Sequence, residues 1–292
     1  MANPLTNQNS NHLWVIPARE ADLAVILWEV PAIGRRGWLT YWVQMTIWNI
    51  KDDTFDTGQW IKAYIFNEWS DLAPDGSVFI YRGLKEQRPI EEQNGYSNNW
   101  VAISRPPYFT ALAFWNTSQQ GSGGFFSTNQ SLSLYNEEAD ELIPHPNHIP
   151  PSTLHIELLH NLDAHKALYE TQFGRRGWQL QNADKIDWRN YWVNPSWIKP
   201  SPDNQYTLRM RRNLTGIYEW SLHETLLIDF DWVDWDCKNR LVGAKAGCLM
   251  VLDPSGPTSQ SSILMDFNSQ IPTTGIIAPE WANEWPSVFD AI

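Results

Sequence analysis

Short apolar runs alternate with polar turn formers over most of the chain. Runs at 23–30, 38–50, 61–66, 78–81, 110–115 and 226–230 are rich in Val, Ile, Leu, Thr and aromatic residues. This composition is typical of half-buried β-strands. Asp75-Gly76 and Lys238-Asn239 lie where two strands would reverse, because these residues favour tight turns. The pattern predicts an all-β protein.

One segment has the spacing of a helix instead. In residues 153–170, Leu154, Leu158 and Leu162 recur every four positions, which places them on one face of a helix. We therefore expect a helix there.

Internal similarity indicates repeated units. The pentapeptide GRRGW at 34–38 recurs unchanged at 174–178, and residues 69–78 align without a gap to residues 232–241. Both members of the second pair contain Trp, then Asp two residues later, then a tight turn and a strand. Because the order is preserved, the sequence predicts that similar β-units follow one another along the chain.

The segment 71–76 (DLAPDG), followed by the apolar run 78–81, resembles the D-x-S-P-D-G hairpin of WD-repeat and related β-propellers. Ala73 stands where that hairpin usually has Ser. We expect Asp71 to cap its own turn and Asp75-Gly76 to supply residues that tolerate positive φ. In the copy at 234–240, which lacks Pro and Gly, Asn239 is expected to take the left-handed position.

The resemblance implies a β-propeller, and 292 residues at roughly 40 to 50 per blade give five or six four-stranded blades. We expect one domain over 1–292, with two similar halves at roughly 12–135 and 153–253 and a C-terminal segment, 254–292, that packs back. The 18 Trp residues would fill the gaps between blades. The segment 12–17 is a candidate first strand that completes the last blade.

The net charge and the composition limit the classes of partner that the sequence favours. With 21 Lys and Arg against 33 Asp and Glu, the chain carries −12, which disfavours nonspecific nucleic-acid binding. The chain has only two cysteines, and its sequence shows neither a signal-like N-terminus nor a long apolar stretch. We therefore expect a soluble, cytoplasmic protein without a membrane partner. Oligomeric state is left open.

Candidate reactive groups do not form a known catalytic pattern. Five of seven histidines fall between His145 and His165, but their spacing favours neither a metal site nor another cofactor site. The run 121–124 (GSGG) lacks the Lys-Ser/Thr of a phosphate loop, so a loop between strands is expected. Among four aspartates, alternation along a strand would place Asp229 and Asp231 on one face, with the other two, Asp234 and Asp236, at a turn.

The repeated pentapeptide supplies the binding candidates. They are Arg35, Arg36, Trp38, Arg175, Arg176 and Trp178. If the two copies share one rim, their guanidinium groups would bind a carboxylate, a phosphate or an acidic partner segment. The alternative is structural: Arg stacks on Trp and its charge is satisfied by Asp71 or Asp234.

Three functions follow as hypotheses. The leading one is a noncatalytic scaffold or recognition subunit that binds another protein or a peptide, because flat Trp and Arg surfaces dominate binding hot spots. The second is saccharide or small-ligand binding through exposed Trp faces, with Trp100, Trp188, Trp192 and Trp197 as candidates. The third is a propeller hydrolase with carboxylates in its central channel, which would require two carboxylates converging on one site.

Overall fold

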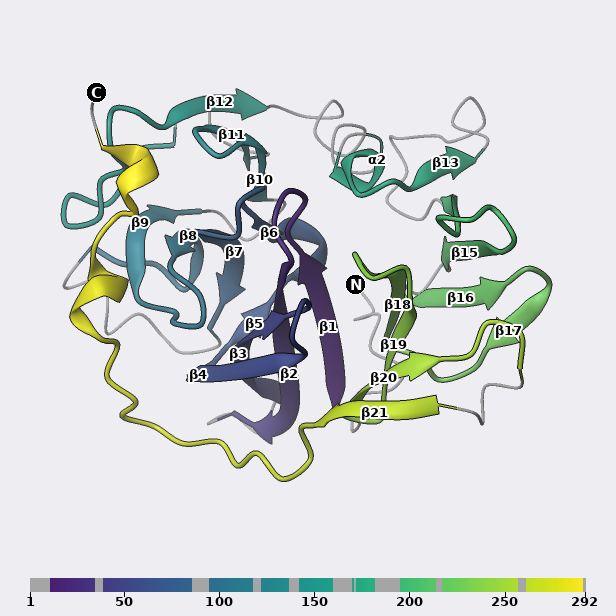
Figure 1. The fold of residues 1–292 in the computed structure, drawn as a ribbon. Coiled ribbons are helices and arrows are strands. Elements are labelled where there is room, and N and C mark those ends of the chain that lie inside the picture. The colour runs from purple at the N-terminus through teal and green to yellow at the C-terminus, as the bar shows by residue number, and fades with distance from the viewer. Residues whose placement is uncertain are drawn as a thin grey trace.

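Five small β-sheets stand in a ring, so the chain is a five-bladed β-propeller, as predicted (Figure 1). This is a computed structural model that describes residues 11–34, 39–85, 95–117, 122–136, 142–159, 170, 172–181, 195–213, 217–256 and 261–290. Each sheet uses strands that are consecutive in sequence, which is the arrangement that repeated β-units produce.

The first two blades hold most of the N-terminal half. Blade 1 consists of β1 (His12–Pro17), β2 (Leu23–Ile33), β3 (Leu39–Asn49) and β4 (Thr54–Lys62). Blade 2 consists of β5 (Tyr64–Ile65), β6 (Asp71–Leu72), β7 (Phe79–Leu84), β8 (Asn99–Ser104) and β9 (Ala111–Asn116).

The other three blades follow in order. Blade 3 contains β10 (Ser122–Thr128), β11 (Ser131–Asn136) and β12 (His155–Leu159). Blade 4, preceded by the short helix α2 (Phe173–Arg175), contains β13 (Gln179–Gln181), β14 (Ser196–Pro200), β15 (Thr207–Arg212), β16 (Tyr218–Leu222) and β17 (Thr225–Leu227). Blade 5 contains β18 (Trp232–Trp235), β19 (Leu241–Lys245), β20 (Cys248–Leu252) and β21 (Ser261–Asp266).

Blade 2 departs from the expected four strands because its first strand is interrupted. Both β5 and β6 pair with β7: Tyr64 lies opposite Leu84, and Asp71 lies opposite Ile80. The 3-10 turn η1 (Asn67–Trp69) separates them. β5 and β6 therefore together form the single strand that would pair with β7 in a four-stranded blade.

The helix expected in 153–170 is wrong over residues 153–159. Residues 155–159 form β12, which pairs in parallel with β11, so that Ile156 lies opposite Leu132. Leu154 is buried in the core between blades 2 and 3, and Leu158 packs against it. Tertiary pairing overrides the weak helical spacing here, and residues 160–169 lie outside the described residues.

The two similar hairpins have the turn residues that the sequence predicts. Gly76 has φ +78° and Asn239 has φ +63°, both in the left-handed region. Leu72 pairs with Phe79, whereas Trp235 pairs with Leu241, so the second loop is one residue shorter.

The expected cap at Asp71 is wrong. The amide of Ser77 donates instead to Asp75 Oδ1 at 2.9 Å, and in the second hairpin the amide of Lys238 donates to Asp236 Oδ1, also at 2.9 Å. Asp71 cannot cap the turn because its carboxylate is buried among arginines from other blades, as described below.

Large aromatic side chains fill the spaces between and within the sheets. The most deeply buried tryptophans are Trp28, Trp48, Trp115, Trp197 and Trp220. All six residues of β8 are buried, because neighbouring structure covers both faces of that strand. Burying a tryptophan removes roughly 150 to 250 Å² from water, so these residues supply much of the cohesion between blades.

Among the strands that the structure describes, none is shared between the first and the last blade. The prediction that 12–17 completes the last blade is wrong, because β1 pairs antiparallel with β2, from His12 opposite Glu29 to Pro17 opposite Ala24. Blade 5 is built entirely from residues 232–266. The strand β1 instead lies beside β18 and β19 without pairing to them.

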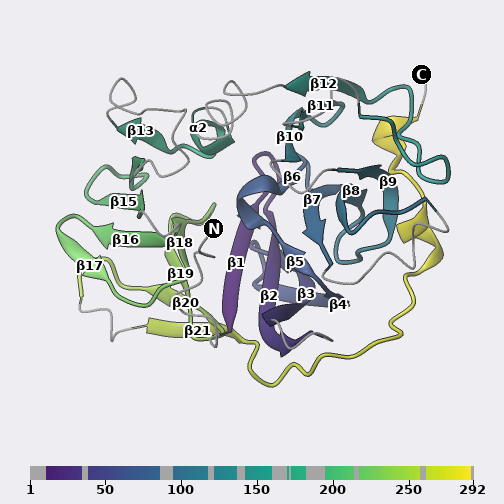
Figure 2. The ribbon, with the colours of Figure 1, turned by 180° about the vertical axis from the view of Figure 1, so that it is seen from behind.

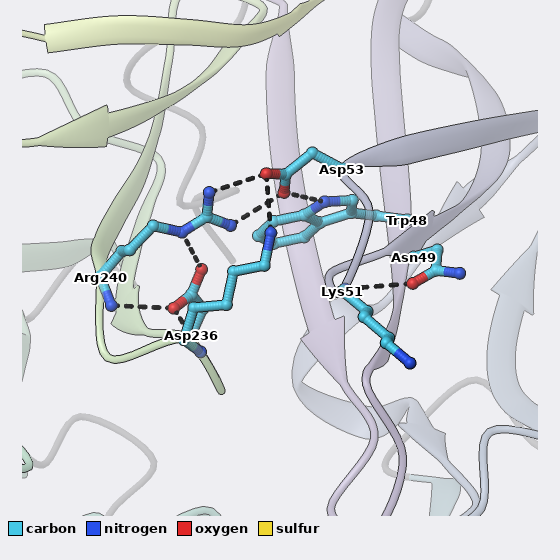
Figure 3. A network of polar contacts seen from close by, with 7 residues as sticks. Trp48, Asn49, Lys51, Asp53, Asp236 and Arg240 are labelled. Atoms are coloured by element: carbon cyan, nitrogen blue, oxygen red, sulfur yellow. Dashed lines mark hydrogen bonds and ion pairs between the residues drawn. The ribbon is translucent and has the colours of Figure 1, made fainter.

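Hydrogen bonds and ion pairs join blade 1 to blade 5 between the β3–β4 turn and the β18–β19 turn (Figure 3). The guanidinium of Arg240 makes two hydrogen bonds of 2.8 Å to Asp53, and its Nε donates to Asp236 at 2.7 Å. Lys238 Nζ and the indole N–H of Trp48 also reach Asp53, at 3.0 and 3.2 Å. These donors hold the pKa of Asp53 far below its usual range.

A C-terminal strap adds a second closure. Residues 267–290 leave β21 in blade 5 and pass blade 1 to reach blade 2 (Figures 1 and 2). Gln59 Nε2 donates to the carbonyl of Ile276 at 2.8 Å, and Arg105 Nη1 donates to that of Trp281 at 2.8 Å. Near the end, Phe289 is 3% exposed and packs into the core between blades 2 and 3.

Candidate functional site

An arginine cluster surrounds Asp71, a fully buried residue on β6. Arg176 Nη2, just after α2, lies 2.6 Å from Asp71 Oδ1, and Arg19 Nη1, in the loop between β1 and β2, lies 3.3 Å from Oδ2. The amide of Phe126 on β10 donates to Oδ2 at 2.9 Å. Blades 1, 2 and 3 and the segment that precedes blade 4 therefore meet at one buried carboxylate.

The same cluster includes a third guanidinium. The carbonyl oxygen of Phe126 accepts hydrogen bonds from Arg19 Nη2 at 2.8 Å and from Arg175 Nη1 at 3.0 Å. The Arg175 guanidinium also lies 5.6 Å from the centre of the Phe125 ring. Partial burial, and then the positive charge of Arg19, lower the pKa of Arg175. The cluster thus contains three cations and one carboxylate, which gives it a formal charge of 3 − 1 = +2.

Two further contacts hold this region across the ring. Gln172 Nε2 donates to the carbonyl of Ser70 at 3.0 Å, and Arg212 Nε lies 3.1 Å from Glu68 Oε1. Both contacts start from blade 2. One reaches the segment just before α2, and the other reaches blade 4, although blade 3 lies between blades 2 and 4 in the ring. The segment before α2 is therefore fixed in place, and the arginines that follow are positioned with it.

The structure brings together only part of the predicted set. Arg175 and Arg176 lie in the cluster, whereas Trp178 is buried and its ring is 5.6 Å from Lys199 Nζ. The carboxylate that pairs with Arg176 is Asp71, one of the two that the structural alternative named. The remaining three candidates, Arg35, Arg36 and Trp38, lie outside the described residues.

The two aligned aspartates have related surroundings. Asp234 on β18 accepts an ion pair from Lys199 Nζ at 2.6 Å, as Asp71 does from Arg176. Asp71 and Asp234 are the residues that follow Trp by two positions in the aligned segments, and both are buried. Each pairs with a cation from the region of α2 and blade 4. Sequence reasoning missed Arg19, because nothing in its local pattern predicts that its loop meets β10.

A second polar cluster lies at the other end of the β1–β2 hairpin. His12 Nδ1 is 2.9 Å from Asp231 Oδ1, and the amide of Leu13 donates to Asp231 Oδ2 at 3.2 Å. Glu29, opposite His12 in the sheet, accepts a hydrogen bond of 3.4 Å from Asn67 Nδ2. Burial raises the pKa of Glu29 to about 7; His12 and Asn67 lower it, and Asp231 raises it further.

The sequence predicts Asp229 and Asp231 on one face of a strand, and this prediction is wrong. The strand β17 ends at Leu227, and Asp229 has φ +62° in an exposed turn. Asp231 faces His12, whereas Asp234 is a strand residue of β18 and not a turn residue. Asp236 does lie at the hairpin turn. These carboxylates therefore point to separate partners.

The histidine-rich stretch is partly an aromatic cluster. His145 stacks on Tyr96 with ring centres 4.0 Å apart, and the Tyr96 hydroxyl lies 2.9 Å from His148 Nε2. His160 and His165 lie outside the described residues. Within the described ranges, no group of three or more His, Cys, Asp or Glu residues could hold a metal ion.

Two other sequence expectations are corrected. Trp100 and Trp197 are buried, so neither presents a face for a saccharide, while Trp188 and Trp192 lie outside the described residues. Residues 122–124 belong to β10 and not to a loop. Gly123 is required there because a Cβ at this position would lie 2.6 Å from Trp69 Cβ, in the neighbouring blade.

No model of a known protein family matches this chain, and no curated protein sequence matches it. Among the residues that the structure describes, no helix has the length and apolar character needed to cross a membrane.

Proposed function

We propose that this protein is a noncatalytic recognition subunit that binds an acidic segment of another protein at the cluster of Arg19, Arg175 and Arg176. The observation that carries the proposal is a cluster of three guanidinium groups with one carboxylate: Arg19 and Arg176 pair with Asp71, and Arg175 binds the same Phe126 carbonyl as Arg19. A relationship to WD-repeat-like propellers is also part of the proposal, and it rests on the hairpin at 71–81.

The charge balance favours a carboxylate ligand. The chain carries −12 overall, yet this cluster has a formal charge of +2. Arg175 is exposed, and its hydrogen bond goes to the neutral carbonyl of Phe126. A second carboxylate would relieve the repulsion between Arg19 and Arg175, and arginine binds carboxylates through charge-assisted, often paired hydrogen bonds.

The cluster is also held in place before a ligand arrives. Arg176 is bound to a buried carboxylate, and Gln172 anchors the preceding segment to Ser70. Preorganised side chains lose less conformational entropy on binding, so more of the interaction energy is retained as affinity. An arginine at such a site fits the residue type that dominates binding hot spots.

Isothermal titration with a matched peptide pair tests the proposal. One peptide carries a run of Asp and Glu, and the other carries Asn and Gln at the same positions. We expect binding of the acidic peptide alone, weakened at least tenfold by Arg175→Ala, which corresponds to about 1.4 kcal/mol. The control is Arg211→Ala, an equally exposed arginine on β15, and it should change affinity less than twofold.

Two results would overturn the proposal. One is equal binding of the acidic and neutral peptides. The other is an equal loss of affinity in the Arg175 and Arg211 variants, because it would indicate a diffuse charge effect and not a site. Copurification gives an independent check: a recognition subunit should bring a partner with it, and that complex should dissociate as salt rises.

A further inference from the structure

We propose that the open edge of β4, beside the C-terminal strap, binds an extended and uncharged segment of another protein. The strand β4 ends the sheet of blade 1, so one of its edges has no partner among the strands that the structure describes. A cavity of about 240 Å³ lies between this edge and the strap. None of the three arginines of the proposed acidic-peptide site lines this cavity, so the inference goes beyond the proposed function.

Three segments form the walls of the cavity. They are residues 59–61 of β4, residues 109–110 of blade 2, and residues 273, 275 and 276 of the strap. Gln59 connects all three. Its side-chain Oε1 accepts a hydrogen bond of 2.8 Å from the amide of Phe109, and its Nε2 donates to the carbonyl of Ile276 at 2.8 Å. The walls are therefore held in place before a ligand arrives, which lowers the entropy lost on binding.

The cavity follows the edge of β4 and not one of its faces. Successive side chains of a strand point to opposite faces of the sheet. The consecutive residues Gln59, Trp60 and Ile61 nevertheless all line the cavity. A cavity that touches three residues in a row lies along the strand edge, where the backbone groups are.

The register of the sheet determines which backbone groups point toward this edge. The amide of Ala63 donates to the carbonyl of Tyr41 at 3.0 Å, and the pairing of β4 with β3 continues from there to Trp60 without a shift. Backbone groups in an antiparallel pair alternately face the partner strand and face away from it. Trp60 and Lys62 therefore turn their N–H and C=O groups away from β3, where an added strand would pair with them.

The strap does not take the place of that added strand. Residues 267–279 form no strand, and the strap reaches β4 through the side chain of Gln59, which binds the carbonyl of Ile276. A strand edge with unpaired backbone groups is a template for pairing with another chain. The backbone of Trp60 is thus available to a partner segment.

The lining residues favour an uncharged segment with an apolar side chain. None of the eight residues that line the cavity is charged, and Ile61, Phe109 and Ile276 are large and apolar. A charged side chain would lose hydration there without gaining an ion partner. Because an apolar cavity of roughly 150 Å³ holds benzene, one of about 240 Å³ has room for an aliphatic or aromatic side chain.

Isothermal titration of the full chain with the peptide acetyl-Thr-Ile-Thr-Ile-Thr-amide tests the inference. The fully N-methylated peptide is the matched control, because it keeps the side chains but has no N–H donors for the strand edge. A peptide with Lys at both Ile positions is the control for charge. We expect saturable binding of the first peptide and at least tenfold weaker binding of the other two.

Two variants of the strap locate the site. Ile276→Trp fills the cavity and should weaken binding of the first peptide at least tenfold. The matched control is Ile277→Trp, which alters the next residue of the strap. Ile277 is 89% exposed and does not line the cavity, so this variant should change the affinity less than twofold.

Equal binding of the methylated and unmethylated peptides, or equal losses in the two Trp variants, would overturn the inference. If Ile276→Trp does not fold, hydrogen exchange of the wild-type chain decides. Saturating peptide should slow exchange of the Trp60 and Lys62 amides at least tenfold, and unchanged exchange would contradict the proposal.

Two further results separate this site from other occupants. Self-association of the free chain that protects the Trp60 and Lys62 amides would assign the edge to a second copy and would also overturn the proposal. Arg175→Ala should leave binding of the uncharged peptide intact, so failure of the acidic-peptide site and failure of this site are distinguishable.

Discussion

Asp53 and Arg240 join the first blade of the ring to the last through two parallel hydrogen bonds of 2.8 Å (Figure 3). The two residues are 187 positions apart, and their two sheets share none of the strands in the described ranges. The contact raises the pKa of Arg240 and lowers that of Asp53, because each charge stabilises the other. Closure of this propeller therefore relies on side chains where a shared strand was expected.

The strap should stabilise the ring through its buried end. Phe289→Ala removes a ring packed between blades 2 and 3 and should lower the free energy of unfolding by about 2 to 4 kcal/mol. Denaturant unfolding measures this loss. The control, Ile277→Ala, alters a strap residue that is 89% exposed and should leave stability unchanged within about 0.5 kcal/mol. Equal effects of the two variants would show that the strap end is not docked.

The left-handed turn residue of the blade 5 hairpin should tolerate glycine and reject a β-branched residue. Asn239 has φ +63°, so Asn239→Gly should be neutral or slightly stabilising, and Asn239→Val should cost about 1 to 2 kcal/mol. Thermal unfolding of both variants checks the prediction. A valine variant as stable as the glycine variant would contradict a left-handed backbone at this position.

Glu29 should make stability depend on pH between about 4.5 and 7. Its pKa is raised from 4.5 to about 7 in the folded chain, so the carboxyl destabilises the fold as pH rises through this window. Glu29→Gln removes that penalty. We expect it to match the wild type near pH 4 and to exceed it at pH 8 by at most about 3 kcal/mol. A difference that shrinks as pH rises would contradict a buried Glu29.

Local features of the fold were predictable because they depend on neighbours in sequence. The apolar runs predicted strands such as β2, β3, β7 and β9, and Asp75-Gly76 and Lys238-Asn239 predicted two of the turns. The left-handed position of Asn239 also followed from the aligned hairpins. These features need only the period of the side chains and the conformations that Gly and Asn tolerate.

Long-range choices were not predictable. The segment 12–17 pairs with β2, its neighbour in sequence, and nothing in its composition distinguishes this pairing from one with the last blade. The same holds for the helix expected at 153–170, where β11 supplies a partner that local spacing cannot reveal.

The candidate site was predictable only in part. Arg175 and Arg176 were marked by the repeated pentapeptide, but Asp71 was expected to cap a turn and Arg19 carried no signal. Arg19 and Asp71 meet because the β1–β2 loop of blade 1 lies beside β6 of blade 2. Glu29 was missed because it follows Trp28 within an ordinary buried strand, and its surroundings come from blades 2 and 5.

Closure of the ring by side chains is tested most directly by a double-mutant cycle between Asp53 and Arg240. The variants are Asp53→Asn, Arg240→Gln and the two combined, each unfolded with denaturant, with Asp52→Asn as the exposed control. A coupling energy of about 1 to 2 kcal/mol is predicted, since the pair is bidentate and partly buried. Additive losses, with a coupling energy near zero, would contradict closure through this pair.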